Sequence, residues 1–234
     1  MEKFDGITFK VVARIKSDFP DKFGIPRQSG LLKTLHSTIV FEPEFRNADA
    51  LRGLEGFSHL WLLWIFSENV RDTWKPTVRP PRLGGNTRLG VFATRSSFRP
   101  NPIAMSCVKI EKINLTGEGA PTIEVSGADL MDGTPIVDIK PYLPYADSIE
   151  GATGGFAEAV RFKHLEVDFA PEVSAAVFPA EKLSALVELL SEDPRPAYQR
   201  SADRVYGIKF AGFDVKFKVA GDHLTVVALS PLQP

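Results

Sequence analysis

Proline- and glycine-rich loops divide the first two-thirds of this chain into short segments. Residues 75–85 alone contain three prolines and two glycines, and a continuous helix cannot run through them because proline removes a helical hydrogen bond and clashes with the preceding turn. The segments between such loops are rich in β-branched and apolar residues, at positions 7–15, 37–42, 57–66, 89–94, 104–114 and 121–126. These runs predict strands, and many strands with few long helices predict a mainly β fold, either a barrel or a sandwich.

The run at residues 57–66 is the most apolar part of the chain. It contains ten residues, whereas a helix that spans a membrane needs about 20. We therefore expect a fully buried strand here. A short helix is expected over residues 49–54, immediately before it.

The last third of the chain has a different character. Leu183, Leu186, Val187 and Leu190 recur at helical spacing, which predicts an amphipathic helix that packs one face on a core. Three further apolar runs follow, at residues 205–210, 213–219 and 224–229. They predict a three-stranded meander with its last turn at residues 220–222. The sequence therefore predicts a second, small α+β unit that begins near residue 170.

The composition excludes several kinds of site. Cys107 is the one cysteine in the chain, so an intramolecular disulfide or a thiolate metal cluster cannot form, and a reducing compartment is favoured. The four histidines lack the spacing of metal ligands, so we expect no metal. No apolar stretch is long enough to cross a membrane, and the N-terminal residues lack the pattern of a secretory signal. We therefore expect a cytoplasmic protein without a membrane segment.

Positive charge is concentrated in one segment, although the net charge is only −1. Residues 71–101 contain one acid and seven basic residues: Arg71, Lys75, Arg79, Arg82, Arg88, Arg95 and Arg99. The segment carries +6 and the rest of the chain −7. Arginine among prolines and glycines suits the binding of phosphate or carboxylate groups. A solvated basic face that pairs with acids elsewhere is the alternative.

Residues 90–102, within this basic segment, predict a strand that runs into a rigid loop. Pro100 and Pro102 restrict the backbone, while Arg95 and Arg99 supply fork-shaped hydrogen-bond donors. Such a loop fits a clamp for a small anion or a cofactor, and it equally fits a structural turn.

Three carboxylates, Asp129, Asp132 and Asp138, follow the strand predicted at 121–126. Acids in this position hold ribose hydroxyls, neutralise a cation or accept a proton, and they also cap turns, for which the pair Asp132-Gly133 is typical. The glycine patterns of a Rossmann site and of a P-loop are both absent from the sequence. Nucleotide binding of those two kinds is therefore not expected.

Five ordered motifs resemble those of the TrmO family, also called the TsaA-like family. They occupy residues 23–31, 53–61, 79–86, 90–102 and 129–135, with the sequences FGIPRQSGL, GLEGFSHLW, RPPRLGGN, GVFATRSSFRPNP and DLMDGTP. Members of the family are S-adenosylmethionine-dependent methyltransferases that act on tRNA. The stretch DPRPAY at 193–198 is similar to the C-terminal extension of bacterial members, so the resemblance extends through most of the chain.

The resemblance implies a non-Rossmann β-barrel methyltransferase domain over residues 1–168 and a small α+β domain over residues 169–234. It implies a homodimer that binds S-adenosylmethionine near the subunit boundary. The implied reaction is methylation of N6 of N6-threonylcarbamoyladenosine beside the anticodon of threonine tRNA. A non-catalytic dimeric barrel that binds a nucleoside or tRNA, or a purely structural dimer, is the alternative.

The resemblance also implies roles for individual residues. Donor contacts are expected from Pro26, Arg27, Gln28, Ser29, Gly30, Leu31, Ser67, Glu68, Arg95, Met105, Asp129, Leu130 and Asp132. Arg95, Asp129 and Asp132 are the expected catalytic residues, with Arg95 on the carboxylate of the donor or of the threonyl group. The sequence does not decide which of Asp129, Asp132 and Asp138 accepts the N6 proton. RNA contacts are expected from Arg79, Arg82, Arg88, Arg99, Arg195 and Tyr198.

Overall fold

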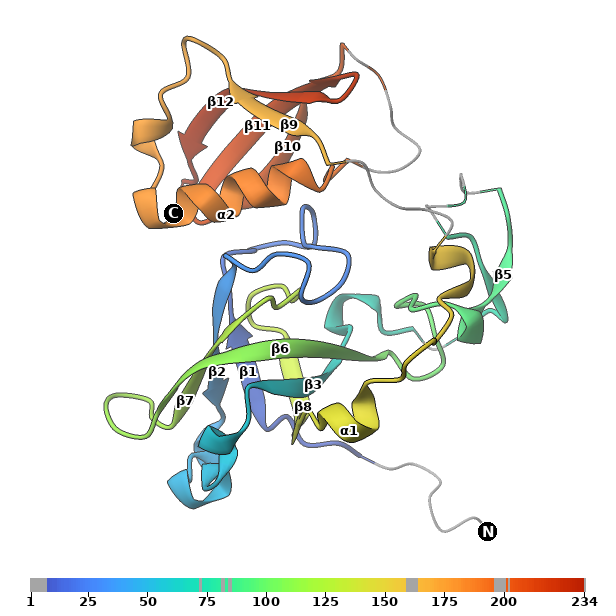
Figure 1. Ribbon diagram of the computed structural model, residues 1–234, viewed down its shortest axis with the longest axis vertical. Helices are drawn as coiled ribbons and strands as arrows, with labels where there is room; N and C mark the ends of the chain where they lie inside the picture. Colours follow the sequence, from blue (N-terminus) through green and yellow to red (C-terminus); the bar gives the residue numbers. More distant parts are fainter. Residues whose placement is uncertain are drawn as a thin grey trace.

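The computed structural model describes residues 8–71, 73–80, 83, 86–158, 164–195, 201 and 203–233. Figure 1 shows two units along the long axis of the molecule, a β-barrel at one end and a four-stranded sheet with a helix at the other. The predicted mainly β fold is confirmed, and it takes the form of a barrel. No helix among the described residues has the length and apolar character needed to cross a lipid bilayer.

Six strands form the closed barrel of the first unit. They are β1 (Ala13–Lys16), β2 (His36–Phe41), β3 (His59–Ile65), β6 (Ile103–Asn114), β7 (Thr122–Ser126) and β8 (Pro135–Pro141). They close in the order β1-β2-β7-β6-β3-β8, and each strand pairs antiparallel with its neighbours. Of the strand predicted at 7–15, only residues from Ala13 onward join the barrel. The sequence predicted no strand at β8, where Pro135, Asp138 and Lys140 obscure the β pattern.

The prediction that residues 57–66 form a fully buried strand is wrong. In β3, Leu60, Leu62 and Trp64 point into the core and are at most 7% exposed. The residues between them are half-buried on the outer face of the barrel, where Tyr142 packs against Trp61 with 5.9 Å between ring centroids. The interior of a barrel takes every second residue of a strand, so the apolar residues on the outer face need other partners.

The second unit is a four-stranded sheet in the order β10-β11-β12-β9. The predicted meander is confirmed as β10 (Tyr206–Phe210), β11 (Phe213–Ala220) and β12 (His223–Pro231). The fourth strand, β9 (Glu166–Phe169), pairs parallel with β12, and the sequence did not predict it. The predicted division between residues 168 and 169 passes through this strand. The predicted helix is confirmed as α2 (Ala180–Ser191), which buries Ala185, Leu186, Leu189 and Leu190.

Short elements connect the strands. β4 (Thr77–Val78) and β5 (Leu89–Gly90) form a two-stranded sheet beside the barrel, and α1 (Pro144–Asp147) follows β8. The 3-10 helices cover Pro43–Phe45, Ala48–Leu51, Leu54–Gly56, Ser67–Asn69, Val91–Ala93, Gly155–Ala157 and Ala175–Val177. The strand predicted at 89–94 therefore ends at Gly90 and continues as a 3-10 helix. The short helix predicted at 49–54 is divided between two 3-10 helices.

The loop at residues 17–35 joins β1 to β2 and passes between the two units (Figure 1). Its apolar residues Phe19, Leu32 and Leu35 are at most 1% exposed and belong to the core of the C-terminal unit. The ring of Phe19 lies 5.2 Å from that of Phe210, between centroids. Burial of large apolar side chains is the main favourable contribution to packing, so this loop is held by the second unit although it connects strands of the first.

Phe19→Ala tests this packing. We expect the variant to lose about 3 to 5 kcal/mol of unfolding free energy, because it removes a fully buried ring and leaves a cavity. Urea denaturation followed by circular dichroism measures the change. Phe9→Ala is the matched control: Phe9 is 57% exposed, so its loss should change stability by no more than about 0.5 kcal/mol. Equal effects of the two variants would contradict the proposed anchoring of the loop.

Candidate functional site

A cavity of about 560 Å³ opens at the end of the barrel beside the loop at residues 17–35. Residues 22–28 of that loop, the end of β3 with the turn after it, the loop at 94–99 and the start of β6 supply most of the lining. Asp129, Met131 and Thr134, from the turn between β7 and β8, complete it. The volume lies within the range of about 300 to 1,000 Å³ typical of small-molecule sites.

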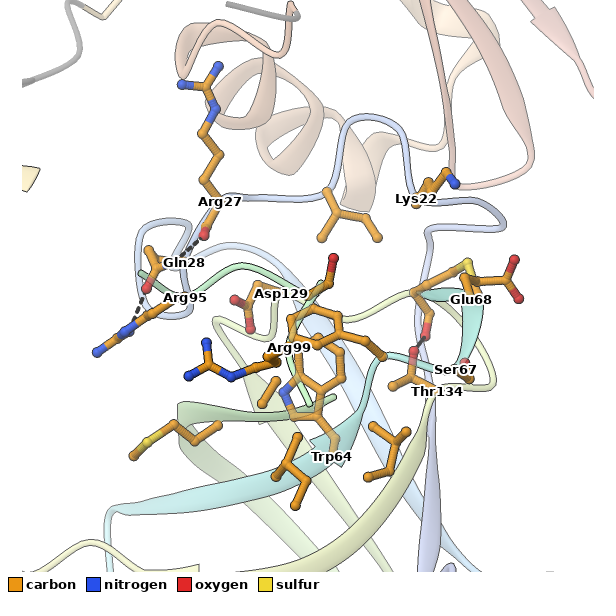
Figure 2. A pocket seen from close by; sticks show the side chains of 18 of the residues that line it. Lys22, Arg27, Gln28, Trp64, Ser67, Glu68, Arg95, Arg99, Asp129 and Thr134 are labelled. Atoms are coloured by element: carbon orange, nitrogen blue, oxygen red, sulfur yellow. Dashed lines mark hydrogen bonds between the residues drawn. The ribbon is translucent and has the colours of Figure 1, made fainter. Parts of the chain in front are cut away.

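Asp129 lies in the middle of the cavity lining (Figure 2). Its carboxylate accepts a hydrogen bond from the Ser106 hydroxyl and others from the backbone N–H groups of Ser29 and of Asp129 itself. Burial raises the pKa of the Asp129 carboxyl above its ordinary value, although these hydrogen bonds and the charge of Arg95 oppose the shift. A buried carboxylate that opens onto a cavity is suited to binding a polar ligand or accepting a proton.

The contact between Ser29 and Asp129 depends on the close approach of Gly127 to Gly30. The Gly30 N–H donates to the Gly127 carbonyl at 2.9 Å. Gly127 has a φ of +79°, and a Cβ there would lie 3.2 Å from the backbone of Gly30. A side chain at residue 127 would therefore push the loop away from the barrel. Glycine is required here because it permits both the positive φ and the close approach.

The rings of Trp64 and Phe66 form an aromatic wall of the cavity beside the Asp129 carboxylate. The indole N–H of Trp64 donates to the Ser106 hydroxyl at 2.9 Å, and this hydroxyl in turn donates to Asp129. The ring of Phe66 packs edge-on against Trp64 with 4.5 Å between centroids. The cavity thus combines an apolar surface for a flat ring system with an acceptor for polar groups.

Arg95 is linked to the loop on the opposite side of the cavity. Its guanidinium donates to the side-chain carbonyl of Gln28, and the amide of Gln28 donates to the Arg27 carbonyl (Figure 2). Arg99 instead donates to the carbonyls of Thr94 and Ser96, at 2.9 and 3.3 Å. Arg99 therefore stabilises the turn that presents Arg95.

The structure brings most of the expected donor contacts to one place. Those that line the cavity are Pro26, Arg27, Gln28, Ser67, Glu68, Arg95, Met105 and Asp129. Those outside the lining are Ser29, Gly30, Leu31, Leu130 and Asp132.

The residues outside the lining support the loop. The Ser29 hydroxyl accepts a hydrogen bond from the Cys107 N–H at 3.0 Å. The Leu130 carbonyl accepts one from the Ser17 hydroxyl, and the Asp132 carboxylate accepts one from the Ser17 N–H, both at 2.9 Å. These contacts fix both the start of the loop and its middle.

Among the described basic residues of the segment at 71–101, all but Arg99 are exposed. Arg79 and Arg88 are exposed beside β4 and β5. Among ion pairs between described residues, none includes a basic residue of the segment at 71–101. The alternative of a basic face paired with acids elsewhere is therefore not supported.

The remaining expected RNA contacts fall elsewhere. The side chain of Arg195 is only 10% exposed and pairs with Asp193. Arg82 and Tyr198 lie outside the described residues.

Sequence reasoning missed several residues of the site, among them Lys22, Trp64, Phe66, Ser106 and Thr134. Trp64 and Phe66 were assigned to a buried strand because their run is uniformly apolar. The sequence signal that could have identified them is their position just before Ser67, which is an expected donor contact. Ser106 is a buried polar residue within an apolar strand, and such residues need a hydrogen-bond partner.

Two observations concern metal-binding and thiolate groups. Within the part of the chain that the structure describes, no group of three or more His, Cys, Asp or Glu side chains is placed to hold a metal ion. Burial raises the pKa of the Cys107 thiol, and the charge of Asp147 adds to the effect. Cys107 therefore stays protonated at neutral pH, which is unfavourable for a nucleophile.

The raised pKa of Asp129 is directly measurable. A carbon NMR titration of labelled protein should show a value above about 3.9, the ordinary value for aspartate. Ser106→Ala should raise the value further, because it removes a hydrogen bond that favours the ionised carboxylate. A titration at or below the ordinary value would contradict the dominant effect of burial.

The same shift links stability to pH. Because folding raises the pKa of Asp129, its contribution to stability is fully present below about pH 4 and is lost as the pH rises through the raised value. The unfolding free energy of Asp129→Asn should therefore increase relative to wild type between about pH 4 and about pH 7. Urea denaturation at several pH values checks this, and parallel pH profiles would count against it.

Comparisons with known proteins identify the family that this chain is similar to. The model of the tRNA-methyltransferase O N-terminal domain matches residues 14–148, and that of the TrmO C-terminal domain matches residues 163–232. The tRNA (adenine(37)-N6)-methyltransferase of Escherichia coli (strain K12) is 41% identical over 230 residues, which cover 95% of this chain and 97% of the relative. The protein of the same name from Eikenella corrodens is 47% identical over 163 residues, 70% of this chain and 91% of the relative.

A solved structure extends the comparison to the fold. The crystal structure of TrmO from Pseudomonas aeruginosa matches with a TM-score of 0.79 at 31% identity, over 97% of this chain and 100% of that chain. Both units are thus shared with a protein of known structure, and the resemblance seen in the sequence motifs is confirmed. The chain belongs to the TrmO family of S-adenosylmethionine-dependent tRNA methyltransferases.

Proposed function

We propose that this enzyme methylates N6 of N6-threonylcarbamoyladenosine beside the anticodon of threonine tRNA. The Escherichia coli and Eikenella corrodens relatives are named for N6 methylation of adenine 37 in tRNA. The observation that supports the proposal most directly is the cavity in which the carboxylate of Asp129, an aromatic wall and the loop of Arg95 converge. It lies beside a basic segment in which Arg79 and Arg88 are exposed.

The side chains of the cavity fit S-adenosylmethionine. Trp64 and Phe66 offer apolar surface to an adenine ring. Pro26 and Gln28 bring the backbone of the loop to the same cavity. When bound, this compound supplies an electrophilic methyl group on a sulfonium.

Arg95 is assigned to a carboxylate, either of the donor or of the threonyl group of the substrate. A guanidinium binds a carboxylate through two parallel hydrogen bonds. Gln28 already holds one nitrogen of Arg95, which limits the positions the side chain adopts. A group fixed in this way lowers the barrier by orienting the reactants.

Asp129 is the aspartate we assign to the N6 proton. It lines the cavity, whereas Asp132 holds the backbone of Ser17 and Asp138 pairs with Lys140 at 2.8 Å. Its raised pKa makes it a stronger base than an ordinary aspartate. Asp129 accepts the proton as N6 takes up the methyl group, and later passes the proton to water.

The basic segment is assigned to the anticodon loop. Arg79 and Arg88 are exposed and placed to contact phosphates. Trp74 and Phe92 are 50% and 73% exposed, and their ring centroids lie 6.1 Å apart. Exposed aromatic rings beside arginines are a common platform for unpaired RNA bases.

We further propose that the protein is a cytoplasmic homodimer. Met105, Tyr145 and Ile149 are 50%, 86% and 74% exposed, and exposed apolar side chains are available to bind a partner. Met105 also lines the cavity, so a partner that covers Met105 would lie near the donor. The free thiol of Cys107 suits a reducing compartment. Sedimentation equilibrium tests the dimer, and the mass of one chain would contradict it.

The two units are proposed as separate domains. The two family models match residues 14–148 and 163–232, and β9 pairs within the second sheet. These observations favour a boundary ahead of Glu166 rather than at residue 168.

Transfer of a labelled methyl group tests the function. Wild-type enzyme should methylate tRNA that carries the threonylcarbamoyl group, and should methylate the same tRNA without it about a hundredfold more slowly or worse. A site built to bind a polar group discriminates strongly against the substrate that lacks it. Equal rates on both tRNAs would contradict the proposed substrate, and no transfer to either would contradict the proposed reaction.

Arg95→Ala and Arg88→Ala separate the two kinds of arginine. Arg95→Ala should lower kcat by about a hundredfold, because it removes a contact that orients the reactants. Arg88→Ala should leave kcat unchanged, raise the KM for tRNA and reduce the salt slope of tRNA binding by about 1. Steady-state kinetics at several salt concentrations measure both effects. Identical kinetic changes in the two variants would remove the distinction.

A further inference from the structure

We propose that Arg195, together with Asp193, is a positioning residue for the donor-binding loop and acts through Arg27. The inference rests on the donor site proposed above. It gives the C-terminal unit a part in donor binding and assigns Arg195 a role other than contact with RNA.

Asp193 and Arg195 form a rigid pair directly after α2. The Nε and Nη2 atoms of Arg195 donate to the two carboxylate oxygens of Asp193, at 2.7 and 2.9 Å. The side chains are only 10% and 17% exposed. Burial acts to raise the pKa of Asp193, but the hydrogen bonds and charge of Arg195 outweigh it and hold that pKa below its ordinary value. Asp193 has a φ of +52°, which is costly for a residue other than glycine and which this pair stabilises.

The pair presents two backbone carbonyls to the donor-binding loop. The guanidinium of Arg27 donates to the Asp193 carbonyl at 3.1 Å and to the Arg195 carbonyl at 3.2 Å. Figure 2 shows the Arg27 side chain extending from the cavity toward the C-terminal unit. The side chain of Arg27 therefore anchors the loop, while its backbone stays at the cavity.

Two hydrogen bonds and one electrostatic contact lead from Arg27 to the site. The Arg27 carbonyl accepts from Gln28, and Gln28 accepts from Arg95. The charge of Arg95 in turn lowers the pKa of Asp129. Two carbonyls of the C-terminal unit are thus connected to the groups that we assign to the donor and to the N6 proton. A network of such contacts carries energetic coupling between two sites when the network has two discrete arrangements and both sites influence which one forms.

Other contacts hold the same loop on both sides of residues 22–28, and Arg27 adds a contact with the C-terminal unit between them. The Glu188 carboxylate of α2 accepts from the N–H groups of Lys33 and Thr34, at 3.2 and 3.1 Å. At the other end, Lys182 of α2 pairs with Asp18. The barrel holds the next residues, Ser29 and Gly30. Arg27 therefore supplies the hydrogen bonds that hold the neighbouring residues Pro26 and Gln28 from the side of the C-terminal unit.

The environment of Arg195 does not suit a phosphate contact. Its side chain is only 10% exposed, its charge is matched by Asp193, and its guanidinium lies 5.9 Å from the ring of Tyr206. Arginines that bind RNA phosphates contribute through accessible, uncompensated charge. Arg79 and Arg88 have that exposure, and Arg195 does not.

Arg195→Met tests the proposal in the full-length protein. We expect the Kd for S-adenosylmethionine, measured by calorimetry, and its KM to rise about five- to thirtyfold, the range for residues within one network. The KM for tRNA and its salt slope should stay unchanged. Arg204→Met is the matched control, because Arg204 is exposed and lies 5.5 Å from the same Tyr206 ring. The control loses the same charge and should retain wild-type donor binding.

Arg195→Lys shows whether the effect of Arg195→Met comes from the lost charge, from a folding defect or from the lost hydrogen bonds to Asp193. Lysine keeps the positive charge but cannot form the two parallel hydrogen bonds to Asp193. The proposal expects this variant to bind the donor weakly while its KM for tRNA stays at the wild-type value. A contact with RNA phosphate predicts the reverse for Arg195→Met, namely a raised KM for tRNA with normal donor affinity, and that result would overturn the proposal.

A double-mutant cycle shows whether Arg195 acts through Arg27. Arg27→Met and Arg195→Met should each weaken donor binding, and the double variant should bind about as weakly as Arg27→Met alone. Additive losses would mean that Arg195 acts by another route, which also overturns the proposal. Wild-type protein that fails to bind S-adenosylmethionine would instead refute the proposed donor site, so the two failures are distinguishable.

Discussion

The burial of Phe19, Leu32 and Leu35 in the core of the C-terminal unit is the constraint on which the site depends. These side chains belong to a loop between two barrel strands, yet their favourable contacts are with the other unit. Each such burial contributes about 1.5 to 3 kcal/mol, far more than the exposed ion pairs nearby contribute. The loop is therefore held across the end of the barrel, and one wall of the cavity is formed where the loop lies over Asp129.

At Asp129, a group that the proposed function needs reduces the stability of the folded protein. Placing a carboxylate in a mostly buried position disfavours its charged form, which is why its pKa is raised. Ser106, Ser29 and Arg95 offset part of that cost and orient the carboxylate toward the cavity. Gly127 allows its backbone and that of Gly30 to come close enough for the Ser29 contact. The same arrangement supplies a hydrogen-bond acceptor beside an aromatic wall, which is the chemistry that a methyl donor with a nucleoside needs.

The local spacing of apolar residues predicted most helices and strands, but it did not predict which elements each of them contacts. α2 and the meander were predicted well, because the spacing of apolar residues reports directly on which face is buried. β8 was missed, since Pro135 and its charged residues hide a strand that the barrel closes by pairing with β1 and β3. The burial of β3 was overestimated, because a uniformly apolar run does not reveal that only one face meets the core. Likewise, eight of the expected donor contacts line the cavity, while Asp132 and Ser29 support it from outside.

By itself, the sequence determined that this protein is mainly β, that a small α+β unit follows, and that its motifs are those of the TrmO family. Those properties are encoded in residue spacing and in short contiguous motifs, which do not depend on distant contacts. Only the tertiary structure decided which aspartate lines the cavity and which arginines face solvent. It also decided that the largely covered side chain of Arg195 pairs with Asp193. The physical reason is that exposure and charge pairing are set by residues far away in the chain, which a pattern of neighbours does not contain.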